Sequence, residues 1–213
     1  MKTPELVEAL SSDLPPIGPH AVEARLARGI GVGAAVSFLA MWMWLGFRPD
    51  LSSAAMTADY WMKFAYTLAL AVFAFWAIDR LARPARTAGL PSLGLALVVA
   101  VLFAIAIAQL MASPPGARHH LMMGSSASVC PWRIAALSLP IFVGTFWSLR
   151  ALAPTRLVLA GAIAGLGSGA LGAWVYAFHC DESAMPFVAI FYTLAMVLMG
   201  AVGAALARRI LRW

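Results

Sequence analysis

The stretch Leu95–Leu110 reads LALVVAVLFAIAIAQL, and it decides the fold class. It lies inside a charge-free run from Thr87 to Ala117. A transmembrane helix needs roughly 17–25 mostly apolar residues, so this run is long enough. Backbone groups in lipid have no water to bond, so only helices and closed barrels can span a bilayer. Barrel strands alternate apolar and polar residues, and this stretch does not alternate. It therefore predicts a transmembrane helix.

Five further apolar runs lie on either side of this one. They are Gly29–Phe47, Phe64–Ile78, Ile134–Leu149, Leu157–Phe178 and Ser183–Ala207. The runs Phe64–Ile78 and Ile134–Leu149 are short. However, Lys63 and Arg133 precede them and can extend their charges to the membrane interface. Of the 213 residues, 62% are apolar and 11% are charged, whereas soluble domains are about 25% charged. We therefore predict an all-α integral membrane protein, a six-transmembrane-helix bundle.

Lysine and arginine are unevenly divided between the two predicted sides of the membrane. Eleven lie on the side of the chain ends: Lys2, Arg25, Arg28, Arg80, Arg83, Arg86, Arg150, Arg156, Arg208, Arg209 and Arg212. Four lie on the other side: Arg48, Lys63, Arg118 and Arg133. Because cytoplasmic loops carry the excess of Lys and Arg, the N- and C-termini are predicted to be cytoplasmic. This bias, with anionic lipid heads, accounts for the net charge of +6 and gives no reason to expect direct nucleic-acid binding.

This topology divides the chain into three parts. Residues 1–28 form a cytoplasmic N-terminal tail, 29–208 a transmembrane domain and 209–213 a cytoplasmic C-terminal end. The first apolar run is interpreted as a retained anchor, because it exceeds the 7–15 residues typical of a signal peptide. In the run Leu157–Phe178, Gly161, Gly165 and Gly169 form GxxxG pairs that let helices approach closely. That packing lies either inside the bundle or at a dimer seam.

The tail carries a short amphipathic helix. Thr3, Pro4 and Glu5 have the pattern of a helix start, with a cap, a proline and an acid in the first turn. Its predicted apolar face consists of Leu6, Val7, Leu10 and Leu14, and its acids are Glu5, Glu8 and Asp13. A helix this short is marginal alone in water, so we expect it to order against a partner protein. The alternative is the inner leaflet, although leaflet-binding helices are usually basic.

The two cysteines are predicted to lie at the outer ends of neighbouring helices. Cys130 precedes the fourth predicted helix and Cys180 follows the fifth. The tight turn Arg150–Arg156 joins these helices, so their other ends should lie side by side. Packed helices are about 8–10 Å apart and a disulfide needs Cα atoms within about 7 Å, a gap that loop residues can close. Three interpretations stay open: a structural disulfide, two unrelated buried thiols, or a switchable pair.

Ionisable residues gather around the predicted cysteine pair. His179, Asp181 and Glu182 flank Cys180, and His119 and His120 lie in the facing outer loop. A cationic histidine would favour the reactive thiolate, and the acids would oppose it. Cys130, Cys180 and His179 are also candidate ligands for a soft or borderline metal ion. No CxxC motif is present, so the usual dithiol-oxidoreductase signature is missing. We expect no resident cofactor, with a transient metal ion at the pair as the exception.

Several short motifs are distributed over the whole chain. They are Gly124-Ser125-Ser126, Cys130-Pro131-Trp132-Arg133, Leu152-Ala153-Pro154-Thr155-Arg156, His179-Cys180-Asp181-Glu182-Ser183, Phe187 with Tyr192-Thr193, and Leu6-Val7, Leu10 and Asp13-Leu14. With these motifs the chain resembles the NrsF-type family of bacterial membrane anti-sigma factors. The resemblance implies a non-enzymatic inner-membrane protein that holds an extracytoplasmic-function sigma factor inactive. It also implies that Cys130 and Cys180 sense metal or oxidative stress, and that the tail and the inner loops contact the sigma factor.

Two alternatives are a small membrane thiol-redox protein and a transporter. A quinone-coupled redox enzyme would need a vicinal dithiol, which the sequence lacks. A transporter needs ionisable groups at depth in the membrane. Asp79 lies at a predicted helix end, and Gln109 is the only strongly polar side chain well inside a predicted span. Both alternatives are therefore disfavoured.

Overall fold

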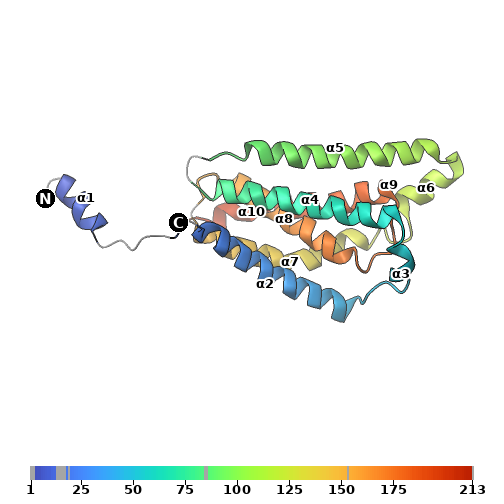
Figure 1. Cartoon of the computed structure of the whole chain (residues 1–213), viewed down its shortest axis with the longest axis horizontal. Helices are drawn as coiled ribbons and strands as arrows, with labels where there is room; N and C mark the ends of the chain where they lie inside the picture. Colours follow the sequence, from blue (N-terminus) through green and yellow to red (C-terminus); the bar gives the residue numbers. More distant parts are fainter. Residues whose placement is uncertain (1–2, 13–17, 19, 84–85, 153, 213) are drawn as a thin grey trace.

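The computed structural model describes residues 3–12, 18, 20–83, 86–152 and 154–212, and within them it contains helices and no strand. In chain order the elements are α1 (Thr3–Ser11), α2 (Ala21–Trp44), α3 (Leu51–Ala54), α4 (Ala58–Leu81), α5 (Gly89–Ala112), α6 (Pro115–Met123), α7 (Cys130–Arg150), α8 (Leu157–Tyr176), α9 (Met185–Phe187), the π-helix η1 (Val188–Tyr192) and α10 (Thr193–Ile210). Figure 1 shows the long helices side by side. We call the end with α3, α6 and α9 the cysteine end, and the end where the chain terminates the terminal end.

Six helices are long and apolar enough to cross a membrane, which confirms the predicted helical class and the predicted number of spans. Five are α2, α4, α5, α7 and α8, and the sixth is the continuous helix Met185–Ile210 formed by α9, η1 and α10. α2 begins at Ala21, ahead of the predicted start at Gly29. The long run Thr87–Ala117 is interrupted at Ser113, because Pro114 has no backbone N–H to continue the helix. The chain resumes there as α6.

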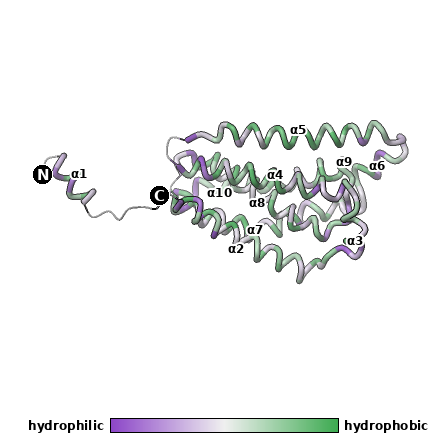
Figure 2. Tube along the Cα trace, in the orientation of Figure 1, coloured by the Kyte–Doolittle hydropathy of each residue, from purple (hydrophilic) through white to green (hydrophobic). Residues whose placement is uncertain are grey.

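Apolar side chains cover much of the outside of the bundle. The most apolar window of α5 has a mean hydropathy of 2.7, yet only 11% of that window is buried. Leu93, Leu97 and Val101 on this helix are all exposed. Soluble proteins rarely expose a continuous apolar face of this kind, whereas it suits a lipid solvent. Figure 2 shows hydrophobic residues along the length of the long helices and hydrophilic residues toward their ends.

α8 forms the centre of the bundle because its small residues let other helices approach closely. Gly161, Gly165 and Gly169 face α10, and a Cβ added at Gly165 would collide with the carbonyl oxygen of Met199. On another side, Gly172 lies against Ser138 of α7. The GxxxG face is therefore used for packing within the chain, which is the first of the two predicted alternatives.

α2 and α7 pack through a second set of small residues. Gly29 and Gly144 approach so closely that a Cβ on either would collide with the backbone of the other. Two turns along α2, the Ser37 hydroxyl donates to the carbonyl of Leu137 over 2.7 Å. This seam ties α2, the helix that follows the tail, to α7, the helix that begins with Cys130.

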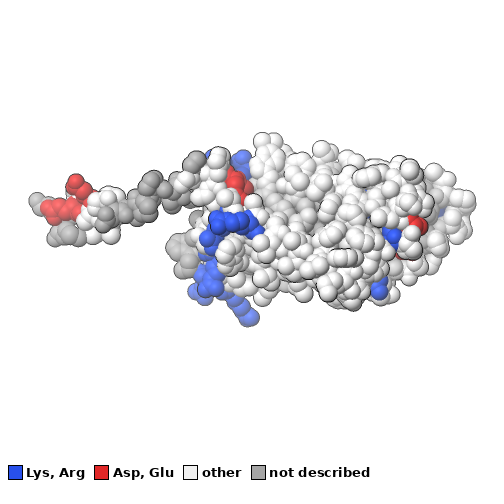
Figure 3. All heavy atoms as spheres, turned by 60° about the horizontal axis from the view of Figure 1, so that its bottom comes forward, with Lys and Arg blue, Asp and Glu red and all other residues white. Residues whose placement is uncertain are grey.

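Charged residues are concentrated at the terminal end. On the face shown in Figure 3, Lys and Arg atoms gather near the chain terminus, and fewer lie toward the cysteine end. An ion-pair network at this end joins α2 to α4, since Arg83 bonds to both Glu23 and Asp79. The uneven division of Lys and Arg predicted from the sequence is thus also found between the two ends of the folded bundle.

Candidate functional site

The structure brings Cys130 and Cys180 together. Cys130 is the first residue of α7, and Cys180 lies in the loop that follows α8, here called the cysteine loop (residues 177–184). Both cysteines are free and buried, and their thiols interact with each other. Cys180 Sγ also lies 3.9 Å from the carbonyl oxygen of Glu182. The short connection between α7 and α8 holds these two helices side by side. The sequence argument used the same connection.

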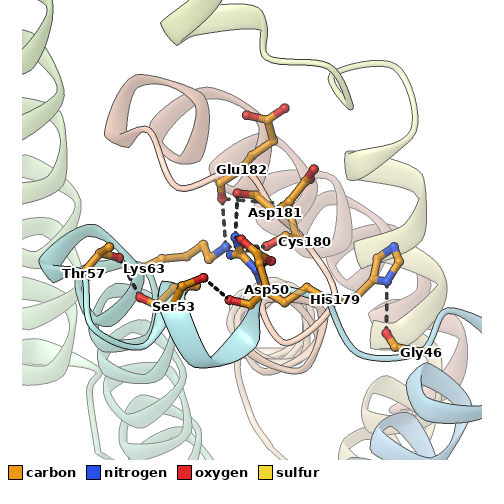
Figure 4. Close-up of polar contacts among 11 residues, drawn as sticks. Gly46, Asp50, Ser53, Thr57, Lys63, His179, Cys180, Asp181 and Glu182 are labelled. Atoms are coloured by element: carbon orange, nitrogen blue, oxygen red, sulfur yellow. Dashed lines mark hydrogen bonds and ion pairs between the residues drawn. The ribbon is translucent and has the colours of Figure 1, made fainter.

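Two cations hold the backbone of the cysteine loop (Figure 4). Arg48 donates to the carbonyl oxygens of Cys180 (3.1 Å) and Asp181 (3.3 Å). Lys63 Nζ donates to the carbonyl oxygens of Cys180 (2.9 Å) and Glu182 (2.8 Å). Lys63 is fully buried, so the prediction that it extends its charge to the membrane interface is wrong. The loop carbonyls supply the polar partners that water would have supplied at the interface.

The two cations differ in their acidic partners. Arg48 forms a two-pronged ion pair with Asp50, with both nitrogen–oxygen distances at 2.7 Å. This guanidinium holds the pKa of the Asp50 carboxyl below its usual range. Lys63 makes no ion pair with a carboxylate among the residues the structure describes. Sequence reasoning missed both cations as site residues, although their position in outer segments rich in acids was a usable signal.

His179 is fully engaged by its neighbours. Its Nδ1 lies 3.0 Å from the carbonyl oxygen of Gly46, and its Nε2 lies 3.4 Å from the guanidinium of Arg133. A carbonyl can only accept and a guanidinium can only donate, so these partners assign the proton to Nδ1 and the lone pair to Nε2. The ring therefore links the segment after α2 to α7 and has no nitrogen lone pair left for a metal ion.

The remaining predicted residues around the pair separate into different roles. Glu182 accepts hydrogen bonds from the backbone N–H (2.6 Å) and the hydroxyl (2.9 Å) of Ser125, and so ties the segment after α6 to the cysteine loop. Asp181 is exposed, as are His119 and His120 on α6. In the described part of the chain, no three His, Cys, Asp or Glu side chains are grouped closely enough to hold a metal ion.

Two buried tyrosines complete the site, and sequence reasoning did not assign them to it, although Tyr192 belongs to one of the motifs that carry the family resemblance. Tyr176 of α8 contacts Cys130 and Arg133. Tyr192 is fully buried and lies against Cys180, and its hydroxyl is without a conventional hydrogen-bond partner among the described residues. The π-helical turn η1 places Tyr192 there, and π-turns recur at functional sites.

These surroundings favour negative charge on Cys180. A hydrogen bond from the Cys130 thiol, helped by the Lys63 ammonium and Tyr192, lowers the pKa of the Cys180 thiol to about 6, although burial opposes the shift. A thiolate is the reactive form of cysteine. The site can therefore present one activated sulfur with a second thiol beside it.

The tail forms the predicted helix but lies apart from the site. α1 has no buried residue, and its apolar side chains Leu6, Val7 and Leu10 are exposed, as are Glu5 and Glu8. Figure 1 draws α1 away from the bundle, beyond the terminal end. Two predicted tail residues, Asp13 and Leu14, lie outside the residues that the structure describes.

The fold and site define a multi-pass helical protein of membrane type, with a thiol pair at one end of the bundle and a short exposed tail at the other. The family model described as "Negative regulator of sigma F" (NrsF) matches residues 10–213, and the chain belongs to this family.

Two relatives are similar over their whole length. A probable anti-sigma-F factor NrsF from Azospira oryzae is 38% identical over 214 residues, with 100% of both chains covered. The anti-sigma-F factor NrsF of Caulobacter vibrioides is 35% identical over 214 residues, again with 100% of both chains covered. No solved structure matches. Membership of this family indicates a regulatory rather than a catalytic role.

Proposed function

We propose that this chain is an anti-sigma factor of the bacterial inner membrane that holds an extracytoplasmic-function sigma factor inactive and releases it when the cysteine pair is oxidised. Family membership and the names of the two relatives support the anti-sigma part. The observation that carries the sensing part is the contact between two free, buried thiols, Cys130 and Cys180. They lie at the start of α7 and in the loop after α8, at the cysteine end of the bundle. Figure 1 shows α1 beyond the opposite end.

Oxidation of adjacent thiols is the reaction that this geometry supports best. Formation of a disulfide gives two electrons and two protons to an oxidant, and it needs the second thiol within reach of the first. A thiol-binding metal ion is the second candidate signal, because two adjacent sulfurs are soft ligands. His179 has no free lone pair to join them, so such an ion would take its further ligands from elsewhere.

Backbone and side-chain hydrogen bonds connect the cysteine loop to the segment that directly follows α2. The backbone N–H of Arg48 donates to the carbonyl of Phe178 over 3.1 Å, and His179 Nδ1 donates to the carbonyl of Gly46 over 3.0 Å. α2 then runs the length of the bundle against α7 and begins at Ala21, just after the tail. A change in the cysteine loop would therefore reach the tail through a single helix.

The tail is the proposed contact with the sigma factor. Leu6, Val7 and Leu10 of α1 are exposed together, and an apolar helix face of this kind fits an apolar groove on a soluble protein. Glu5 and Glu8 would border that contact and favour the basic surface that a sigma factor presents to DNA. Ordering a short helix on binding offsets part of the contact energy, which keeps the complex releasable.

The direct test is to purify the full-length protein from membranes together with the sigma factor encoded beside it. We expect co-purification from reduced membranes and loss of the sigma factor after treatment with hydrogen peroxide, with a disulfide between Cys130 and Cys180 in the released state. A parallel sample with a thiol-binding divalent metal ion separates the two candidate signals. Failure of the reduced protein to retain any sigma factor would contradict the proposal.

Orientation in the membrane is tested separately. Reporter fusions after Arg86 and after Arg118 should report opposite sides, with Arg86 cytoplasmic, because Lys and Arg are concentrated at the terminal end. Both fusions on the same side would contradict the six-span topology.

A further inference from the structure

The same backbone carbonyl, that of Cys180, accepts from two buried cations that are balanced differently. Arg48 reaches it over 3.1 Å and is neutralised by Asp50 through two bonds of 2.7 Å. Lys63 reaches it over 2.9 Å and lacks a carboxylate partner among the described residues. Holding the loop requires only hydrogen-bond donors. An unbalanced charge at the same place therefore needs a separate explanation.

A buried ammonium without a negative partner is costly, because the charge loses its hydration and gains no counter-charge. The charged and titratable groups that face Lys63 are Arg48, Asp50, Asp181, Cys180 and Cys130. Arg48 has the same sign and is already paired with Asp50. Asp181 is exposed to solvent, where its charge is screened. The two thiols are the remaining groups that can supply a negative charge inside the site.

We propose that Lys63 is a positioning residue of the cysteine pair, whose ammonium is the counter-charge of a Cys180 thiolate and makes Cys180 the sulfur that reacts first. Cys130, which donates its hydrogen bond to Cys180, is then the sulfur that completes the disulfide. The inference rests on the proposed function for its biological meaning, but the order of reaction of the two sulfurs can be measured without a sigma factor.

With a hydroperoxide as oxidant, the steps balance as follows. The Cys180 thiolate attacks one peroxide oxygen, the O–O bond breaks, and the departing alkoxide or hydroxide takes a proton from water. Cys180 is then a sulfenic acid. The Cys130 sulfur attacks the Cys180 sulfur, the S–O bond breaks, and the hydroxyl leaves as water with the Cys130 proton. The peroxide gains two electrons, and the two cysteines lose two.

This sequence removes the negative charge beside Lys63. The disulfide is neutral, so the ammonium keeps only its two hydrogen bonds to the carbonyls of Cys180 and Glu182. Lys63 must then lose a proton or move toward solvent, and either change weakens its hold on the cysteine loop. The chemistry of the pair is thereby coupled to the loop that bonds to the segment after α2.

The test is competitive alkylation of the full-length, reduced protein in native membranes, with iodoacetamide and peptide mass spectrometry at each cysteine. In the wild type we expect Cys180 to be alkylated at least about tenfold faster than Cys130, because Cys180 is the sulfur held as a thiolate beside Lys63. Lys63→Gln should reduce that preference, because it removes the counter-charge and leaves the hydrogen bond from Cys130, and Lys63→Arg should retain it. Arg48→Gln is the matched control, because it removes a hydrogen bond to the same carbonyl but not the unbalanced charge.

Equal loss of the preference in Lys63→Gln and Arg48→Gln would overturn the proposal, since Lys63 would then act only as a donor to the loop. Faster alkylation of Cys130 than of Cys180 in the wild type would overturn it as well. An unchanged Cys130 rate in Lys63→Gln shows that the site has stayed closed. If the site opens in Lys63→Gln and both alkylation rates rise, the ratio of the Cys180 rate to the Cys130 rate in Lys63→Arg decides. A ratio like that of the wild type supports the proposal, and loss of the preference overturns it. The proposed function has its own contradicting outcome, which is that oxidation does not release a sigma factor.

Discussion

At the cysteine end of the bundle, side chains from α4, α5, α7 and two connecting segments bond to residues 178–185. At the terminal end most charges lie on the surface. Gln109 of α5, for example, accepts from the backbone N–H of Met185 over 2.9 Å. The terminal end has the exposed helix α1 and the surface ion pairs of Arg83. The difference is between a site built from many hydrogen bonds and an end with an exposed helix and surface ion pairs.

A site fixed by hydrogen bonds and an exposed helix suit different tasks. Reaction between two thiols depends on their mutual position, so many bonds that fix the cysteine loop favour one defined chemistry. Recognition by a short exposed helix requires freedom to dock and to leave. The comparison therefore predicts opposite phenotypes for the two ends. Variants at the cysteine end should lose the response to the oxidant, and variants at the terminal end should lose repression of the sigma factor.

The largest expected effect is at the cysteine end. Cys130→Ser and Cys180→Ser should each abolish induction of the sigma-dependent promoter by peroxide, and the double variant should behave like either single one. Both sulfurs are needed for one bond, so their effects cannot add. Promoter-reporter output before and after peroxide measures this. Unequal effects that add in the double variant would show that the two cysteines act independently.

The next largest effect is at the terminal end. Leu10→Glu places a charge on the apolar face of α1 and should weaken sigma-factor binding by about 1–3 kcal/mol, or about 5- to 150-fold, as for a central contact residue. The reporter should then be active without stress. Ser12→Glu is the matched control, because it adds the same charge beside the exposed acids, away from Leu10. A silent reporter in Leu10→Glu, with the protein still in the membrane, would assign the contact to the inner loops.

A smaller effect concerns how the reactivity of Cys180 depends on pH. Because the Cys180 pKa is lowered to about 6, its folded value lies below that of an ordinary thiol. The resulting stabilisation is present above the unfolded pKa and is lost as the pH falls through about 6. We expect the alkylation rate of Cys180 to have its midpoint near that pH and to fall about tenfold per unit below it. Cys130→Ser should move the midpoint, since the Cys130 thiol is the main cause of the shift. A midpoint near 8.5, as for a free thiol, would contradict the arrangement.

The smallest effect concerns the seam that joins the two ends. Gly29→Ala should destabilise the bundle by about 1–3 kcal/mol, because its Cβ would collide with the backbone of Gly144 and force α2 away from α7. Gly31→Ala, two residues further along α2 on its exposed side, meets open space and should be neutral or slightly stabilising. Thermal unfolding in a mild detergent compares them. Equal stability of the two variants would show that the seam can relax at little cost.

The features predicted from the sequence are those that depend on local pattern. Apolar run length was enough for the number of spans, and the short Arg150–Arg156 connection was enough to expect the cysteines near each other. Arg48 and Lys63 could not be assigned to the site, since a basic residue near a helix end has the same local sequence whether it meets water or a distant carbonyl. Lys63 and Cys180 are 117 positions apart, and only the packed bundle brings them together.

Tyr192 was not assigned to the site for a different reason. Its position depends on η1, and one turn of π-helix inside an apolar span has no strong sequence pattern. The glycine seam of α8 was recognised, but its partner was not, because the same GxxxG spacing serves contacts within a chain and between chains. Contacts that depend on backbone geometry, such as the π-helical turn and the glycine seam, are thus harder to predict from the sequence than contacts that depend on residue type.

The π-helical turn also gives the last span two rotational phases. Each residue advances an α-helix by about 100°, so the extra residue accommodated in Val188–Tyr192 offsets the faces on either side of it. Beyond the turn, Gly200 and Gly203 keep their alignment with α8, while Tyr192 is aligned with the cysteines. Deletion of one residue within η1 would bring the span to a single phase. The helix could then satisfy its contact with α8 or its contact with Cys180, but not both.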